Sequence, residues 1–146
     1  MQKFLGLTLT AAVMVAAPFQ SALAAANDVV GVWVTPEAKS NVQISQSGGK
    51  FIGKIISLKE PTEKGKPKVD NKNPQAALRN RPLQGLQILS GLSFKDDMWV
   101  GGTIYNPTDG KTYSCQMKLK DKNTLELRGY VMGMPALGKS QIWKRK

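Results

Sequence analysis

The sequence predicts an all-β protein, namely a single antiparallel β-barrel of about eight strands with one long loop. Segments with a period of two between apolar and polar residues recur along the chain. Gly-Gly, Asp-Gly and Lys-Asn pairs separate several of them, as tight hairpins require. Residues 25–146 hold no helical pattern of ten or more residues. A β-sandwich is the alternative, but a closed barrel leaves no exposed edge strands.

The predicted strands comprise residues 29–34, 41–46, 50–58, 86–90, 98–105, 111–119, 124–131 and 139–145. In the first of them, Gly31 allows a close backbone approach and Trp33 would plug one end of the barrel. Trp143 has a matching structural role in the last strand, where a neighbouring cation would stack over a ring. The pair Gly101-Gly102 predicts a bulge or a strong bend, as a barrel corner needs.

Alternation within the strands predicts which residues face the interior. The clearest inward row is in residues 111–119 and consists of Tyr113, Cys115, Met117 and Leu119. The next strand is expected to turn Leu125, Leu127 and Val131 inward. Residues 50–58 are apolar on both faces, which predicts a strand that is covered on both sides. The single cysteine, Cys115, is therefore expected to be buried and structural.

The long connection between residues 59 and 85 is rich in Lys, Pro and Asn and is too long for a plain hairpin. Asn73-Pro74 predicts a short helix over residues 75–79, with Asn73 as its N-cap. Long ordered loops in small domains are often functional lids.

Composition excludes several chemistries. The chain of 146 residues has no His and one Cys. Serine or cysteine catalysis through a His base, imidazole metal sites, thiolate zinc clusters and intramolecular disulfides are therefore excluded. We expect no metal and no cofactor.

The N-terminal segment predicts export. Lys3 precedes an apolar run from Phe4 to Ala17, Pro18 interrupts it, and Ala22-Leu23-Ala24 resembles a signal-peptidase site. We expect residues 1–24 to be a signal peptide, with cleavage after Ala26 as the alternative, and residues 25–146 to form one domain. The expected location is the periplasm or the medium, with no transmembrane segment in the mature chain.

The charge is strongly basic. The formal net charge is +11, and removal of residues 1–24, which contribute Lys3 alone, leaves +10. Such a balance favours anionic partners. Nucleic acid is not expected, since aromatic residues do not interleave with the basic ones as a stacking platform requires.

Two blocks hold the candidate ligand-binding residues. In the long connection, Arg79 and Arg81 would clamp a carboxylate or phosphate, or Asp70 would pair with one of them to fix the loop. In the block from Trp99 to Pro107, Tyr105 and Asn106 end a strand at the barrel mouth, where Lys111 follows. The candidate site therefore comprises Asp70, Arg79, Arg81, Trp99, Tyr105, Asn106 and Lys111.

The order of these blocks resembles the bacterial "domain of unknown function 2147" family. The resemblance rests on Gly31-Val32-Trp33, Lys59-Glu60-Pro61, Gly65-Lys66-Pro67, Asp70, Asn73-Pro74, Arg79-x-Arg81-Pro82-Leu83, Gly85, Ile88, Gly91, Trp99-x-Gly101-Gly102-x-Ile104-Tyr105-Asn106-Pro107, Gly110-Lys111-x-Tyr113, Arg128-Gly129 and Gln141-x-Trp143. This resemblance implies an exported protein with a lipocalin-like barrel. It indicates no enzymatic reaction.

We therefore expect a monomeric barrel that binds one small apolar or amphipathic anionic ligand. Two alternatives remain open. One is an envelope interaction protein that docks through its basic surface. The other is an enzyme that uses Asp70, Tyr105 and the arginines as its acid, base and binding groups.

Overall fold

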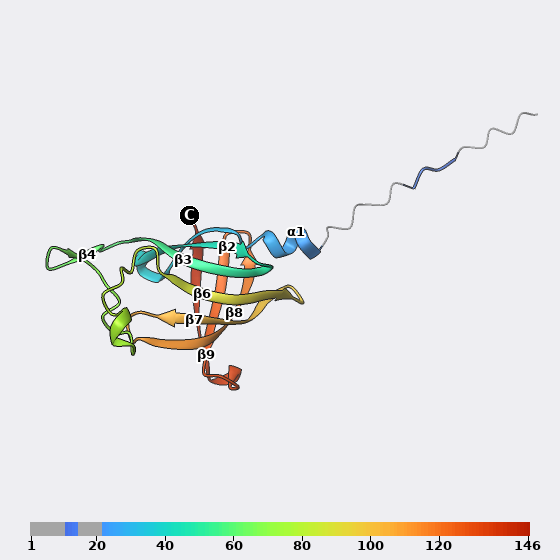
Figure 1. Cartoon of the computed structure of the whole chain (residues 1–146). Helices are drawn as coiled ribbons and strands as arrows, with labels where there is room; N and C mark the ends of the chain where they lie inside the picture. The colour runs from blue at the N-terminus through green and yellow to red at the C-terminus, as the bar shows by residue number, and fades with distance from the viewer. Residues whose placement is uncertain (1–10, 15–21) are drawn as a thin grey trace, which may run out of the picture.

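The computed structural model describes residues 11–14 and 22–146. Eight antiparallel strands form a closed barrel in the order β1-β10-β9-β8-β7-β6-β3-β2 (Figure 1). Their bounds are Gly31–Val34 (β1), Ser40–Ser47 (β2), Lys50–Leu58 (β3), Gln87–Lys95 (β6), Met98–Asn106 (β7), Lys111–Asp121 (β8), Thr124–Tyr130 (β9) and Lys139–Arg145 (β10). The predicted fold class is confirmed, and each of the eight expected strands is present.

The first and last strands close the barrel, since Trp33 of β1 lies opposite Arg145 of β10. Tight turns join β2 to β3, β7 to β8 and β8 to β9 at the predicted places, for example Gly48-Gly49, where both residues have positive φ. The predicted irregularity at Gly101-Gly102 is confirmed, because the β7–β8 register shifts between Trp99 and Gly102. A Cβ at Gly102 would lie 2.5 Å from Leu92 and from the Ser90 carbonyl oxygen, so a side chain is excluded there.

The prediction for residues 86–90 was too short, because β6 continues to Lys95. Gly91 has a φ of 70° and lies at an irregular point of the pairing between β3 and β6. A glycine in a strand often marks a bulge rather than an end. Here the chain resumes its pairing beyond Gly91, with Leu92 opposite Phe51.

Two predicted orientations were wrong. Strand β3 is covered on one side only, because Phe51 and Ile55 are buried while Ile56 is 37% exposed. Val131 does not face inward but is 57% exposed, because β9 ends at Tyr130 and the chain turns away after it. The inward row of β8 is confirmed, with Cys115 and Met117 fully buried.

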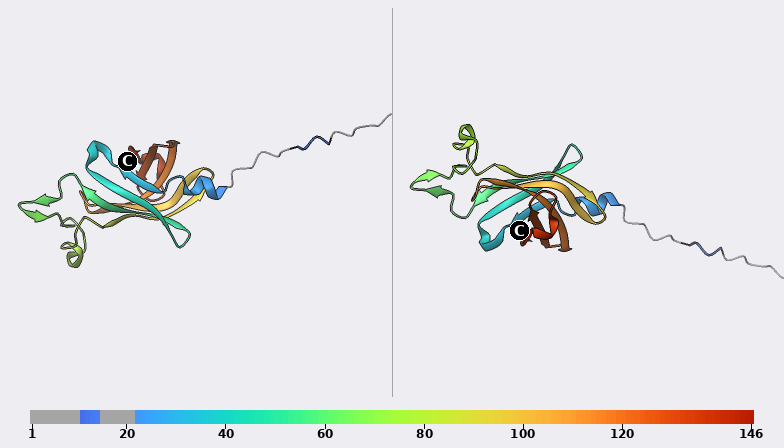
Figure 2. Two further views of the ribbon diagram at one scale, coloured as in Figure 1. Left: turned by 90° about the horizontal axis from the view of Figure 1, so that it is seen from above. Right: turned by 90° about the horizontal axis from the view of Figure 1, so that it is seen from below.

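The long connection forms an outlying structure at one end of the barrel. Two short strands, Thr62–Glu63 (β4) and Lys66–Pro67 (β5), make a separate hairpin, and the 3-10 turn Ala76–Leu78 (η2) follows. Figure 2 shows this hairpin and the turn at the end of the molecule away from α1 (Ala22–Asn27). The predicted helix is thus a single 3-10 turn. Asn73 is not its N-cap, because it accepts a hydrogen bond from the Gln75 amide ahead of the turn.

Large aromatic residues fill the end of the barrel that lies next to α1. The Trp99 indole donates a hydrogen bond to the Ala26 carbonyl at 3.1 Å, and its ring packs against Phe51 and Phe94. Trp33 is fully buried and donates to the Val29 carbonyl at 2.9 Å. This end is therefore closed by packed side chains.

Two further 3-10 turns, Pro36–Ala38 (η1) and Pro135–Leu137 (η3), connect strands. In the described ranges, no helix has both the length and the apolar character to cross a membrane. Much of the predicted signal peptide lies outside the described residues.

Candidate functional site

The end of the barrel opposite α1 contains a cavity of about 930 Å³. Its deeper wall is apolar and includes Ile55, Ile88, Ile104, Leu127 and Trp143, all of which are buried. The polar atom of Trp143 is satisfied, because its indole donates to the Gln141 side chain at 3.0 Å. The cavity thus offers an apolar interior with no unpaired indole N–H facing an incoming ligand.

Charged residues surround the opening of this cavity. Among the lining residues are Lys39, Lys59, Lys68 and Lys139, together with the acidic residues Glu37, Glu60 and Asp109. Lys39 and Lys68 form ion pairs with Glu37 and Glu60, each at 3.6 Å. Lys59 and Lys139 have no ion pair among the described residues. These two amines are the ones available to an anionic group at the opening.

Residues of the β7–β8 hairpin form one side of the opening. Asn106 lines the cavity, and its side-chain oxygen accepts a hydrogen bond from the Thr108 amide. Tyr113 donates to Asp109 at 2.6 Å, which raises the pKa of the Tyr113 phenol. The sequence predicted that Tyr113 faces the barrel interior, and Asp109 was interpreted only as a turn residue. Lys111 is exposed and is absent from the cavity wall.

The long connection is held to the barrel by Asp70, which is fully buried. Its carboxylate accepts hydrogen bonds from Tyr105 at 2.6 Å, Asn73 at 2.8 Å and Arg81 at 2.9 Å. The Asp70 amide also donates to the Arg81 carbonyl at 2.9 Å. The expectation that Asp70 pairs with one of the arginines to fix the loop is thus confirmed for Arg81.

The contacts of Asp70 determine its protonation. Burial opposes ionisation and acts to raise the pKa of this carboxyl. The hydrogen bonds from Tyr105, Asn73 and Arg81, with the charge of the guanidinium, outweigh burial and lower the pKa below its ordinary value of 3.8. Burial and the bond to Asp70 also raise the pKa of the Tyr105 phenol. Asp70 is therefore an ionised anchor, and a carboxylate that already accepts three donors is a poor general base.

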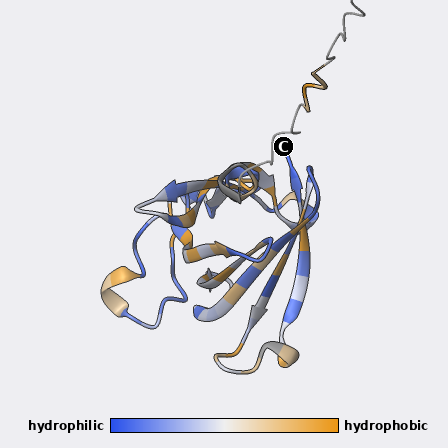
Figure 3. Cartoon of the chain, turned by 90° about the vertical axis from the view of Figure 1, so that its right-hand side faces the viewer, coloured by the Kyte–Doolittle hydropathy of each residue, from blue (hydrophilic) through white to orange (hydrophobic). Residues whose placement is uncertain are grey.

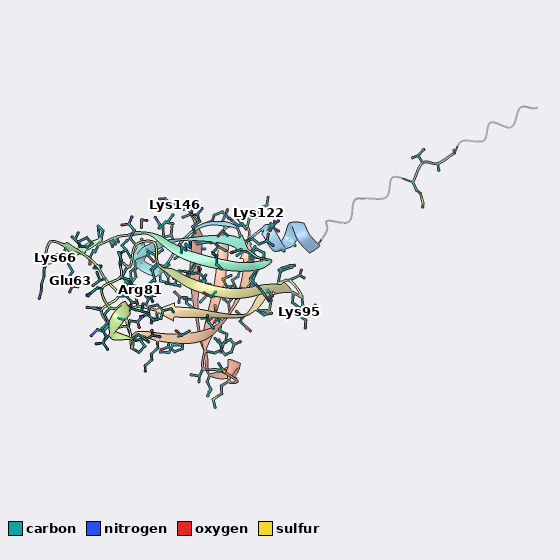
Figure 4. The ribbon with its side chains drawn as sticks, in the orientation of Figure 1. Glu63, Lys66, Arg81, Lys95, Lys122 and Lys146 are labelled. Carbon is teal, nitrogen blue, oxygen red and sulfur yellow. The ribbon has the colours of Figure 1, made fainter. Side chains whose placement is uncertain are left out.

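The two candidate arginines have different contacts. Arg81 is partly exposed, lies 5.7 Å over the Tyr105 ring and borders a smaller hollow of about 270 Å³. This hollow is outside the barrel wall, because it is lined by the outward residues Ser90, Thr103 and Thr112. Figure 4 shows Arg81 beside the short turn of the long connection. Arg79 donates to the Asn73 carbonyl at 2.7 Å.

Neither arginine lines the larger cavity, and neither does Asp70, Lys111 or Trp99. Of the seven candidate ligand-binding residues, the structure brings Tyr105 and Asn106 to the cavity wall and joins Asp70, Arg81 and Tyr105 in one cluster. A clamp formed by Arg79 and Arg81 stays a prediction, and it would hold an anion outside the barrel. The sequence did not predict Lys59 and Lys139 as site residues, because their positions depend on which loops meet at the cavity opening.

Gly31 and Trp33, two of the three residues predicted to be structural, lie at the closed end, whereas Trp143 lines the cavity. The Arg145 guanidinium lies 4.3 Å over the Trp33 ring, so the predicted stacking of a cation on an aromatic ring is confirmed. Arg145 also donates to the backbone carbonyls of Asp28, Val30 and Lys122. Gly31 beside it has a φ of 145°, which favours glycine, and a Cβ there would lie 2.6 Å from the Arg145 guanidinium and displace it.

The single thiol offers little chemistry. Cys115 is fully buried, and burial raises the pKa of its thiol to about 12. Within residues 11–14 and 22–146, no group of three potential ligands from Cys, Asp and Glu could hold a metal ion.

A closed antiparallel barrel with one packed end and one open, apolar cavity defines a lipocalin-like fold. The chain belongs to a bacterial family described as "Uncharacterized protein conserved in bacteria (DUF2147)", whose model matches residues 31–145. The resemblance inferred from the motifs is thereby confirmed. No curated protein matches the sequence.

A solved structure is similar over most of its length. It is protein HP1028 from the human pathogen Helicobacter pylori, described as belonging to the lipocalin family. It shares 31% identity with this chain, with a TM-score of 0.71, and the alignment covers 80% of this chain and 82% of that one.

Proposed function

We propose that this protein is an exported binding protein that holds one small amphipathic anion in its open half. The apolar body of the ligand lies against Ile55, Ile88 and Leu127, and its anionic head meets Lys59 and Lys139 at the opening. The observation that carries the proposal is the cavity of about 930 Å³, which lies at the upper end of the range for small-molecule sites.

Charge at the opening supports the choice of an anion. An ammonium group that is not already paired gains most from a carboxylate or phosphate, and Lys59 and Lys139 are so placed. The net charge of the chain also attracts anions over longer distances.

Export belongs to the same proposal. The pattern of residues 1–24 supports cleavage after Ala24. The contact between Trp99 and the Ala26 carbonyl favours this position over cleavage after Ala26, because Ala26 then stays attached to the domain that it helps to pack. N-terminal sequencing of the periplasmic protein should begin at Ala25. An intact Met1 in the membrane fraction would contradict export.

Native mass spectrometry tests the binding function. Protein purified from the periplasm of its own bacterium should carry a small molecule, released on denaturation and ionising as an anion. A second preparation, stripped by organic solvent and refolded, serves as the control and should take up a long-chain fatty acid at a ratio of one to one. An apo mass in the first preparation together with no uptake in the second would overturn the proposal.

A further inference from the structure

An apolar loop lies beside the cavity opening, between β9 and β10. Four of its side chains are exposed: Val131 by 57%, Met132 by 83%, Met134 by 52% and Leu137 by 72%. Among the residues from 25 to 146 whose burial the structure describes, three other large apolar side chains are exposed, namely Val30, Ile56 and Ile142. Exposed apolar residues that gather in one short segment mark an interaction site more often than scattered ones do.

The loop has a fixed shape. The Met134 amide donates to the Val131 carbonyl at 2.9 Å, and the Leu137 amide donates to the Met134 carbonyl at 3.0 Å. Arg128 of β9 donates to the Ala136 carbonyl at 3.3 Å. The view coloured by hydropathy (Figure 3) shows this loop projecting from the barrel with apolar residues at its tip. The side chains are thus presented to solvent by a folded turn.

Two cations lie next to the loop in the sequence. The segment from Leu127 to Ser140 contains Arg128, which donates to the loop backbone at Ala136, and Lys139, and it contains no acidic residue. Lys139 follows the loop directly and lines the cavity opening, as do Val131 and Leu137. An apolar tip flanked by cations is the pattern that binds an anionic membrane surface, with the apolar groups among the acyl chains and the cations at the headgroups.

We propose that residues 131–137 dock the open end of the barrel onto an anionic lipid bilayer. Met132, Met134 and Leu137 enter the interface, while Lys139 remains at the headgroup level. The cavity opening, which Val131 and Leu137 line, then lies close to the bilayer surface, so an amphipathic molecule has a short path between bilayer and barrel. The docking itself does not depend on the proposed ligand, since the loop and its charges are present in the empty protein.

Vesicle cosedimentation tests the docking, with protein processed in the periplasm and checked for its N-terminus. Wild type should bind vesicles that contain phosphatidylglycerol and should bind pure phosphatidylcholine at least about tenfold more weakly, with the difference shrinking at high salt. The double variant Met132→Ser/Met134→Ser should lose about tenfold or more in binding to the anionic vesicles. The control Val30→Ser/Ile56→Ser removes two exposed apolar side chains elsewhere and should bind like wild type.

A fluorescent reporter gives an independent reading. The three native tryptophans are at most 2% exposed, so Met132→Trp adds one exposed tryptophan at the loop tip. Its emission should shift to the blue on anionic vesicles. Unshifted emission, or equal vesicle binding by wild type and the double serine variant, would overturn the proposal. So would a lipid-free dimer of the wild type that the serine variant abolishes, because the loop would then join two copies of the chain.

Fatty-acid uptake by the double serine variant separates the two proposals. Normal uptake with lost vesicle binding supports docking by the loop. Normal vesicle binding by a wild type that takes up no fatty acid contradicts the ligand proposal alone.

Discussion

The two halves of the barrel share the same strands but differ in the size of their inward side chains. On β7, the large Trp99 fills the closed half and Ile104 lines the open half. On β9, Leu125 and Leu127 are followed toward the opening by Gly129, which has no side chain at all. The comparison teaches that the order of large and small residues along β7 and β9 makes room for the cavity, because the backbone of the barrel continues through both halves.

The largest difference between the halves should appear in stability. Trp99→Ala removes a ring that packs on two other aromatic residues, and we expect it to lower the free energy of unfolding by about 3–5 kcal/mol. Ile104→Ala, at the wall of the existing cavity, should cost about 2 kcal/mol. Urea denaturation measures both. A larger loss of unfolding free energy for Ile104→Ala than for Trp99→Ala would contradict the description of one end as packed and the other as open.

The anchor of the long connection should give the next largest effect. Asp70→Asn keeps the shape but removes the charge that three donors share, and we expect a loss of about 2 kcal/mol at neutral pH. Because folding lowers the pKa of Asp70, its contribution is complete above the ordinary value of 3.8 and is lost as the pH falls through the lower, folded value.

Melting temperatures of wild type and Asp70→Asn therefore converge in acid. A constant gap between the two curves down to pH values well below 3.8 would contradict the assignment of Asp70 as an ionised anchor.

Substitution of Arg81 distinguishes a role in fixing the long connection from a role in binding a ligand. Arg81→Ala should lower stability by about 1–2 kcal/mol, since the guanidinium is partly exposed and its pairing with Asp70 is weakened by solvent. The affinity for a fatty acid should change by less than about twofold, because Arg81 does not line the larger cavity. Isothermal titration at low and high salt checks this. Reduced, salt-dependent affinity with unchanged stability would instead support the arginine clamp.

Thiol labelling compares the accessibility of two positions that lie opposite each other on β8 and β9, Cys115 and Gly129. Cys115 is fully buried and its thiol has a raised pKa, so the folded protein should resist a maleimide at mildly alkaline pH. The double variant Cys115→Ser/Gly129→Cys puts a thiol at the cavity wall instead and should react in the folded state. Mass spectrometry counts the labels. Rapid labelling of folded wild type would contradict the burial of Cys115.

Much of the fold could be predicted because its signals are local. Alternation of apolar and polar residues predicted the strands, and the Gly-Gly, Asp-Gly and Lys-Asn pairs predicted the turns. Predictions failed where tertiary packing decides, as for Val131, whose strand ends one residue earlier, and for β3, whose outer apolar face no layer covers.

The site was predicted only in part. A pairing of Asp70 with one of the two arginines followed from their types and spacing, as did the place of Tyr105 and Asn106 at the end of a strand. Lys59 and Lys139 are 80 positions apart and belong to different connections, so their meeting at one opening depends on the closure of the barrel.

The central claim is that a ligand occupies the open half, and a series of substitutions at Gly129 tests it most directly. Gly129 lines the cavity, and a Cβ there meets only ordinary contacts, the nearest at 3.7 Å. Gly129→Ala should bind a long-chain fatty acid almost as wild type does. Gly129→Phe should fold normally, place a ring inside the cavity and bind about tenfold or more weakly by titration calorimetry. Equal affinity of wild type and Gly129→Phe would show that the ligand binds elsewhere and would contradict the account.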